Sequence, residues 1–175
     1  MQKIRKVLID EESIAKKVKE LGKQIEKDYA GKSPVVVAIL KGSIIFYADL
    51  VRNINLPMRF DTMSVSSYGS GTVSSGNVKI KKDLAKDISG EDVLLIEDII
   101  DSGNTMKALT SLLEHRGAKS IKVCSFLDKP SRRTTDFKAN YVGYEIPDEF
   151  VVGYGLDYDE KYRNLPYVGI LEITD

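Results

Sequence analysis

The sequence predicts an α/β fold in which a mostly parallel sheet is flanked by helices. Two aliphatic runs, 35–40 (VVVAIL) and 93–96 (VLLI), contain no alternating polar residues, which is typical of strands buried on both faces of a sheet. A tight polar turn and the start of a helix follow each run. In open sheets of this kind, ligands bind at the carboxyl ends of the strands, where both turns lie.

The length and the composition predict one globular domain. The chain has 175 residues, of which 42% are hydrophobic, and Lys plus Arg and Asp plus Glu each number 26. With zero net charge, no overall field favours nucleic acid or an anionic membrane as a partner. The N-terminus lacks an apolar signal core, and the longest aliphatic run is far too short to span a membrane. We therefore expect a cytoplasmic protein.

The single cysteine and the single histidine restrict the chemistry. Cys124 falls in a predicted strand, where a small buried core residue is expected, and one cysteine excludes an intrachain disulfide. His115 is expected in the last turn of a helix, where a cation suits the helix dipole. The chemistry should therefore depend on carboxylates, lysines, backbone groups and a bound metal.

The N-terminal part predicts a strand and a helix. Residues 3–9 resemble a short edge strand, and Asp10 is expected to cap a helix that runs to about Asp28. Apolar residues recur at helical spacing on one face of this helix, and its lysines and glutamates form a solvated face. Gly31 ends it.

The first buried strand, residues 35–40, leads into Lys41, Gly42 and a helix expected over residues 44–53. Lys41 supplies a point charge and Gly42 exposes backbone N–H groups, so this turn can bind an anion. The alternative is a lysine whose alkyl chain merely packs at the sheet edge. The residues alone leave both interpretations open.

A polar segment with three glycines covers residues 66–77. The runs on either side, 58–66 and 77–82, can pair as a hairpin. We therefore expect a long mobile flap here rather than a linker between domains.

The central motif is the run 97–105 (EDIIDSGNT). The strand before it is expected to end where the acids begin, and a helix should run from about residue 104 to 116. The unpaired N–H groups of that helix, with Gly103 and the hydroxyls of Ser102 and Thr105, make a phosphate cradle. The sequence therefore predicts a phosphate site at this turn.

Three carboxylates in the same motif, Glu97, Asp98 and Asp101, would repel a phosphate. They need sugar hydroxyls, a hard cation such as Mg²⁺, or a proton to abstract. A phosphorylated sugar that carries a metal satisfies all of these requirements. The alternative is an ordinary strand-to-helix junction with Asp101 or Ser102 as the N-cap.

The C-terminal part is β-like and aromatic. A strand is expected over residues 120–127, followed by Lys129 and by two arginines, 132 and 133, that we expect to be exposed without a specific role. Residues 141–158 are rich in tyrosine and glycine, which suits a flat slot for a planar heterocycle or, alternatively, aromatics packed into the core. Residues 167–173 predict a closing strand.

Several of these motifs resemble one family. The run 93–105 resembles the phosphoribosyl diphosphate signature of the type I phosphoribosyltransferases, and residues 40–43 (LKGS) resemble the diphosphate loop of their 6-oxopurine members, in which the peptide before the lysine is often cis. Ser67 and Tyr68 match the Ser-Tyr pair of the family's catalytic lid. Residues 141–158 resemble the purine hood of the hypoxanthine-guanine phosphoribosyltransferases.

This resemblance implies the type I phosphoribosyltransferase fold as one domain over residues 1–175. A flexible lid is expected at about 66–77, and a base-binding hood at about 141–170 together with the N-terminal segment. The implied activity is purine salvage: Mg²⁺-dependent transfer of the 5-phosphoribosyl group from phosphoribosyl diphosphate to hypoxanthine or guanine. The family usually forms homodimers or homotetramers, and the resemblance implies the same here.

The resemblance also implies a role for each site residue. Asp101 is the implied general base. The residues implied to bind the phosphoribosyl group are Glu97, Asp98, Ile99, Ile100, Asp101, Ser102, Gly103, Asn104 and Thr105. Those implied to bind the diphosphate are Lys41, Gly42 and Arg163. The residues implied to bind the purine are Lys129, which bonds its exocyclic oxygen, Phe150, Val151 and Asp157. Those implied to bind the metal are Glu97, Asp98 and Asp157.

Two other functions remain open from the sequence. A regulator of this fold could sense the same ligand and bind nucleic acid or a protein, although the zero net charge and the lack of an added DNA-binding segment weigh against it. A phosphoribosyltransferase for another base is weakened by Lys129, which suits a carbonyl oxygen better than the amino group of adenine.

Overall fold

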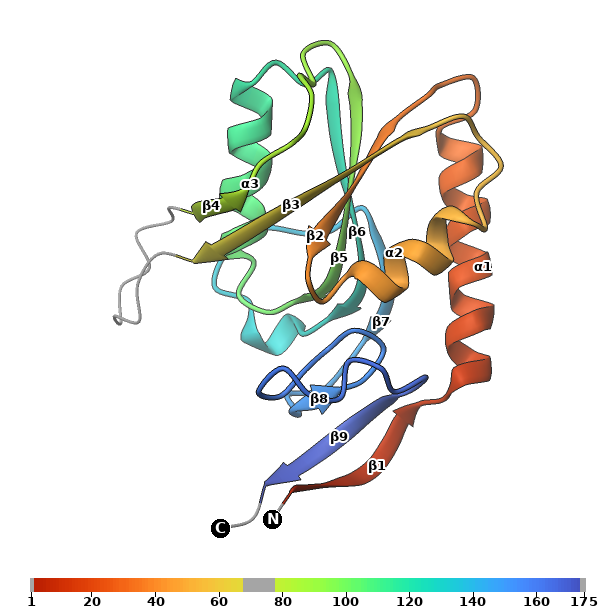
Figure 1. Cartoon of the computed structure of the whole chain (residues 1–175), viewed down its shortest axis with the longest axis vertical. Coiled ribbons are helices and arrows are strands. Elements are labelled where there is room, and N and C mark those ends of the chain that lie inside the picture. Colours follow the sequence, from red (N-terminus) through yellow and green to blue (C-terminus); the bar gives the residue numbers. More distant parts are fainter. Residues whose placement is uncertain (1, 68–77, 174–175) are drawn as a thin grey trace.

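A six-stranded sheet forms the centre of the computed structural model, which describes residues 2–67 and 78–173 (Figure 1). The strand order is β4-β3-β2-β5-β6-β7, and every neighbouring pair is parallel except β3 and β4. The strands are β2 (Val35–Leu40), β3 (Arg59–Ser67), β4 (Val78–Lys82), β5 (Asp92–Ile100), β6 (Ser120–Asp128) and β7 (Tyr141–Glu145). The predicted mostly parallel sheet is confirmed.

Helices cover both faces of this sheet (Figure 1). The helices α1 (Glu11–Asp28) and α2 (Ile44–Val51) pack on one face, and α3 (Asn104–His115) packs on the other. Alternate residues of β2 explain why the strand is apolar throughout: Val36 belongs to the core under α1 and α2, whereas Val37 belongs to the core under α3.

The helix starts follow local chemistry. The Asp10 carboxylate accepts a hydrogen bond of 2.8 Å from the Ser13 N–H at the start of α1, as expected of an N-cap. At the start of α3, Gly103 takes the N-cap position with φ of 83° and provides no capping side chain. The Asn104 N–H, the first of α3, donates to the Ser102 hydroxyl oxygen at 3.2 Å, so the turn itself provides a partner for this N–H group.

A second, three-stranded antiparallel sheet joins the two ends of the chain. Its strands are β1 (Gln2–Ile9), β8 (Val151–Val152) and β9 (Val168–Ile173), in the order β1-β9-β8. β1 lies at an edge, as the sequence predicts. Figure 1 shows this sheet beyond the carboxyl end of β5, and the short helix η1 (Pro130–Arg132) follows β6.

The expectation that the buried strand ends before the acids is wrong. β5 continues through Glu97 and Asp98 to Ile100. The reason is asymmetric pairing, because β6 pairs with β5 as far as Ile100, whereas pairing with β2 stops at Ile96. The two acids therefore lie within β5, beyond the last residue that pairs with β2.

Three further expectations can be compared with the fold. Cys124 is fully buried, and burial raises the pKa of its thiol, so it is a core residue. In the part of the chain that the structure describes, no helix has the length and apolarity needed to cross a membrane. Of the expected lid at about 66–77, the structure describes only Ser66 and Ser67, the last two residues of β3. Tyr68 and the rest of 68–77 lie outside the described residues.

Candidate active site

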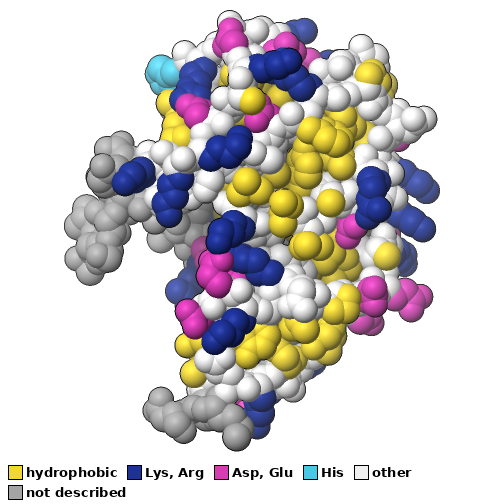
Figure 2. All heavy atoms as spheres, in the orientation of Figure 1, with side chains coloured by type: hydrophobic (Ala, Val, Ile, Leu, Met, Phe, Trp, Pro, Cys, Tyr) yellow, Lys and Arg dark blue, Asp and Glu magenta, His cyan; other side chains and the backbone are white. Residues whose placement is uncertain are grey.

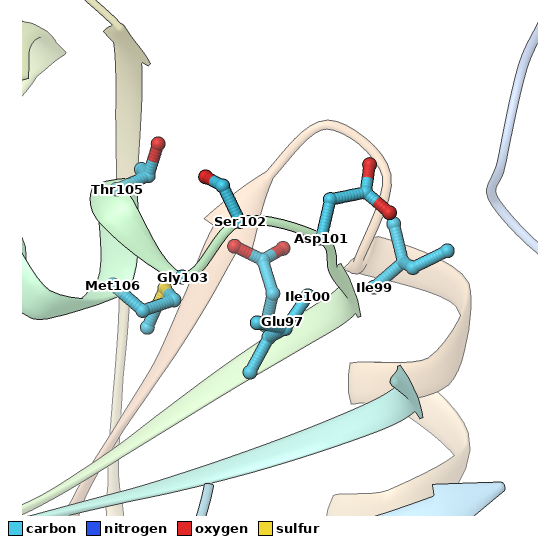
Figure 3. A pocket seen from close by; sticks show the side chains of 8 residues that line it. All are labelled: Glu97, Ile99, Ile100, Asp101, Ser102, Gly103, Thr105 and Met106. Carbon is cyan, nitrogen blue, oxygen red and sulfur yellow. The ribbon is translucent and has the colours of Figure 1, made fainter. Parts of the chain in front are cut away.

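The central motif lines a cavity of about 270 Å³ at the carboxyl end of β5 (Figure 3). Its lining residues are Glu97, Ile99, Ile100, Asp101, Ser102, Gly103, Thr105 and Met106. In Figure 3 the carboxylate of Glu97 points toward the turn that carries Ser102. The motif therefore brings acids, hydroxyls and a helix N-terminus to one opening.

Glu97 and Asp98 are adjacent carboxylates, of which Glu97 is buried and Asp98 is half-buried. Burial and the neighbouring Asp98 raise the pKa of Glu97 well above its usual range. Burial also raises the pKa of Asp98, although the Ile99 N–H and the charge of Arg163 act in the opposite direction. Two acids in this setting are stabilised by hydroxyl donors or by a hard cation.

This donor set fits a Mg²⁺ ion that arrives with a phosphorylated substrate. Mg²⁺ is usually held by one or two carboxylates together with substrate phosphates. The described residues contain no group of three or more His, Cys, Asp or Glu side chains able to hold a metal by themselves. The Asp157 carboxylate instead accepts from the Glu160 N–H at 2.9 Å and lies 3.2 Å from Arg163 Nη1.

The turn after β5, residues 101–103, is held in place by the segment after β6. The N–H of Thr134 donates to the Ser102 oxygen at 3.1 Å, and the Thr135 hydroxyl donates to the same oxygen at 3.2 Å. A Cβ at Gly103 would lie 2.6 Å from the Thr135 hydroxyl, and φ at Gly103 is 83°. Only glycine fits this position without strain.

Lys129 lies beside Asp101. Its N–H donates to the Ile100 oxygen at 2.9 Å, and this hydrogen bond holds the end of β6 against the end of β5, where the turn 101–103 begins. The Lys129 ammonium is 3.9 Å from the Asp101 carboxylate, which is 56% exposed. The structure therefore brings together a cation and an accessible carboxylate that the sequence places 28 residues apart.

The turn after β2, at Lys41 and Gly42, lies against Asp98. The peptide between Leu40 and Lys41 is cis. A Cβ at Gly42 would lie 1.7 Å from Asp98 Oδ2, and a Cβ at Gly155 would lie 2.0 Å from the Gly42 oxygen. These two glycines let the acidic strand, the lysine turn and the C-terminal segment approach one another closely.

The C-terminal segment contributes an arginine and an exposed aromatic ring. Arg163 Nη1 donates to the Gly155 oxygen at 2.8 Å. The Phe150 side chain is exposed, and its ring centroid lies 5.6 Å from that of Tyr158 in an edge-on arrangement. Val151 is buried in β8, where it pairs with Ile170. A planar group can thus stack on Phe150 beside the backbone of β8.

Comparison with known proteins adds a family to this geometry. The phosphoribosyl transferase domain model matches residues 7–159. Hypoxanthine-guanine phosphoribosyltransferases of Bacillus subtilis and Streptococcus thermophilus are 56% and 54% identical over 169 residues, covering 97% of this chain and 94% of each relative. The chain belongs to the hypoxanthine-guanine phosphoribosyltransferase family.

Solved structures of the hypoxanthine-guanine phosphoribosyltransferase family have the same fold. A hypoxanthine phosphoribosyltransferase from Staphylococcus aureus superposes with a TM-score of 0.93 at 53% identity, covering 97% of this chain and 92% of that one. A hypoxanthine-guanine phosphoribosyltransferase from Bacillus anthracis, with a HEPES molecule in its active site, has a TM-score of 0.93 at 46% identity, covering 99% and 100%. The type I phosphoribosyltransferase fold is confirmed.

Sequence reasoning missed two residues at the site of this family member. Arg133 was expected to be exposed without a specific role, but its side chain is only 15% exposed. The guanidinium contacts the Asp128 carboxylate and donates a hydrogen bond to the Asp101 main-chain oxygen. Glu160, for which the sequence predicts no role, contacts both Lys41 and Arg163. Arg132, in contrast, is exposed and pairs with Asp148 at the surface. No pattern in the sequence separates the two neighbouring arginines.

Proposed function

We propose that the chain transfers the 5-phosphoribosyl group of phosphoribosyl diphosphate to hypoxanthine and guanine. The observation that carries this proposal is the position of Lys129 next to Asp101, 3.9 Å apart at the edge of the phosphate turn. A cation for a purine carbonyl oxygen and a base for a purine proton are then adjacent to a phosphate site.

The proposed mechanism assigns the sugar and its phosphate to the central motif. The turn at Ser102 and Gly103, with the Thr105 hydroxyl, binds the 5′-phosphate through the N-terminus of α3. Glu97 and Asp98 orient the ribose hydroxyls, directly or through Mg²⁺. Bound there, Mg²⁺ would neutralise charge on the departing diphosphate.

In the chemical step, a purine ring nitrogen forms a bond to the anomeric carbon while the bond from that carbon to the diphosphate oxygen breaks. Asp101 takes the proton from the purine ring. Lys41, Gly42 and Arg163 bind the diphosphate as it accumulates negative charge. All of these groups belong to this chain. They lie on the turn after β5, on the turn after β2, or on segments that contact one of these turns.

We propose that the small sheet serves as the purine hood. Phe150 stacks on the base, the backbone at Val151 meets its edge, and Asp157 supports the adjoining turn. The exposed ring of Phe150 supports this assignment, because a large aromatic side chain that is 49% exposed is suited to stacking.

We also propose that the chain forms a homodimer or homotetramer. Ile44 and Ile45 of α2 are 48% and 40% exposed, and Phe60 of β3 is 58% exposed. Figure 2 shows hydrophobic side chains gathered over α2 and β3. A second copy packed on this apolar face, defined by Ile44, Ile45 and Phe60, would remove it from water.

The activity is tested by incubating the purified chain with phosphoribosyl diphosphate, Mg²⁺ and either hypoxanthine or guanine. Formation of IMP or GMP with stoichiometric diphosphate is expected, and a chelator should abolish it. Binding of phosphoribosyl diphosphate without nucleotide formation would instead support a regulator of this fold.

A further inference from the structure

The Glu160 carboxylate bridges the two cations that the proposed function assigns to the diphosphate. Glu160 Oε2 lies 2.6 Å from Lys41 Nζ, and Glu160 Oε1 lies 3.1 Å from Arg163 Nη2. Each carboxylate oxygen therefore contacts one cation. An anionic ligand that uses both cations must compete with this side chain.

The backbone holds Glu160 in this position against its conformational preference. Tyr158 and Lys161 exchange both N–H···O bonds, at 3.1 and 3.0 Å, around the two-residue turn of Asp159 and Glu160. Both turn residues have positive φ, 53° and 60°. Such turns favour Asn-Gly, and a side chain as long as Glu is unfavourable in the left-handed region.

Neighbouring contacts fix the turn and the lysine relative to each other. The Asp157 carboxylate accepts from the Glu160 N–H at 2.9 Å and lies 3.2 Å from Arg163 Nη1. The close approach of Gly155 to the Gly42 oxygen sets the distance between the C-terminal segment and the lysine turn. A strained residue aimed at two functional cations is the kind of outlier that points to a role.

We propose that Glu160 is an internal substitute for the diphosphate: it holds Lys41 and Arg163 in the ligand-free protein and is displaced when the diphosphate binds. This inference rests on the proposed function of those two cations. The Glu160 side chain is 64% exposed, so it can swing into water without leaving a buried charge. Its displacement weakens diphosphate binding and thereby speeds release of that product.

The test is titration of the full-length chain with inorganic diphosphate in a Mg²⁺-containing buffer, by calorimetry. Glu160→Gln keeps the shape of the side chain and removes its charge. Because each of the two exposed ion pairs contributes a factor of roughly two to five to an equilibrium, we expect diphosphate to bind the variant about fourfold to 25-fold more tightly. The difference should shrink in high salt, since both contacts are screened.

Asp159→Asn is the matched control. It removes the same charge from the same turn, also at a residue with positive φ, but Asp159 pairs with Lys161 at 3.5 Å rather than with the diphosphate cations. We expect its affinity for diphosphate to change less than twofold. An equal gain in both variants would assign the effect to general electrostatics and overturn the proposal.

Unchanged or weaker binding by Glu160→Gln would also overturn it, because a purely structural role for Glu160 can only lower affinity. If the wild-type chain itself binds no diphosphate, the proposed function of Lys41 and Arg163 fails first. The two failures are thus distinguishable.

Discussion

Arg133 Nη1 donates a hydrogen bond of 2.8 Å to the main-chain oxygen of Asp101. The same guanidinium contacts the Asp128 carboxylate, the residue before Lys129. The Arg133 side chain therefore links Asp101, the proposed general base, to the end of β6, which is followed by Lys129, the proposed purine-binding residue. The position of Asp101 depends on a contact far from it in sequence.

Replacing Arg133 by Met should lower both stability and turnover. The Asp128 side chain is 11% exposed, and leaving such a carboxylate without its partner costs about 1–3 kcal/mol. At about 2–4 °C per kcal/mol, Tm should fall by several degrees, and kcat by about tenfold or more. Arg132→Met, at an exposed surface pair, is the control. Equal effects in both variants, measured by thermal unfolding and steady-state assay, would contradict this role.

Replacing Asp101 by Asn should reduce kcat by about 10² to 10⁴, the usual contribution of a general base. The side chain is 56% exposed, so folding should be preserved. Calorimetric binding of IMP should persist, which separates lost chemistry from lost binding. Turnover near the wild-type rate would exclude Asp101 as the base.

Replacing Gly42 by Ala should impair the site more than it impairs the fold. The new Cβ would lie 1.7 Å from Asp98 Oδ2, so either the carboxylate or the lysine turn must move. We expect kcat/KM for phosphoribosyl diphosphate to fall by about 10² or more. Gly31→Ala is the control, since its φ of 77° makes the substitution strained while no atom lies within 4 Å. It should cost stability and leave kcat/KM unchanged; the opposite pattern would argue against the assignment.

Replacing Glu97 by Gln should stabilise the ligand-free chain at neutral pH while abolishing efficient turnover. Because the native pKa of Glu97 is raised above 4.5 by burial and by Asp98, its contribution to stability is fully present below pH 4.5 and is lost as pH rises through the native pKa. Gln is neutral at every pH and therefore avoids the cost of a buried negative charge. The Tm of the Glu97→Gln variant should exceed that of the wild type at pH 8, and the difference should vanish toward pH 4. Glu114→Gln, on the exposed face of α3, should show neither effect. A lower Tm for the Glu97 variant at pH 8 would refute the argument.

Replacing Phe60 by Ser should weaken self-association if a second copy covers the apolar face. Phe60 is the most exposed of the three residues of this face, and among the aromatic rings of the described residues its ring contacts only that of Tyr47, in a T-shaped arrangement. Sedimentation velocity should show a dimer or tetramer for the wild type and a shift toward monomer for the variant. Ile173→Ser, at another exposed apolar side chain, serves as the control. A monomeric wild type would rule out the homo-oligomer.

The strands and helices followed from the sequence because burial dictates their patterns. The unalternated runs at 35–40 and 93–96 predict strands covered on both faces, and β2 and β5 contribute to both cores. The predicted end of β5 was wrong because its pairing with β6 continues after its pairing with β2 stops. This asymmetry depends on two partner strands and cannot be predicted from one segment alone.

The proposed site was accessible from local motifs but not from isolated residues. The acids and the turn that follows them are contiguous in sequence, so the sequence predicts that they lie together, and they line one cavity in the structure. The contacts of Arg133 and Glu160 join segments about 30 and 120 residues apart. Tertiary geometry decides that Arg133 rather than Arg132 is directed inward. It also decides that Glu160 is the turn residue that contacts Lys41.

The most direct test of the central claim is nucleotide formation from phosphoribosyl diphosphate and Mg²⁺ with hypoxanthine, guanine, xanthine, adenine and uracil offered separately. If Lys129 and Asp101 read and deprotonate a 6-oxopurine, hypoxanthine and guanine should be converted, and adenine and uracil should not. Conversion of adenine at a comparable rate, or of no base at all, would contradict the account.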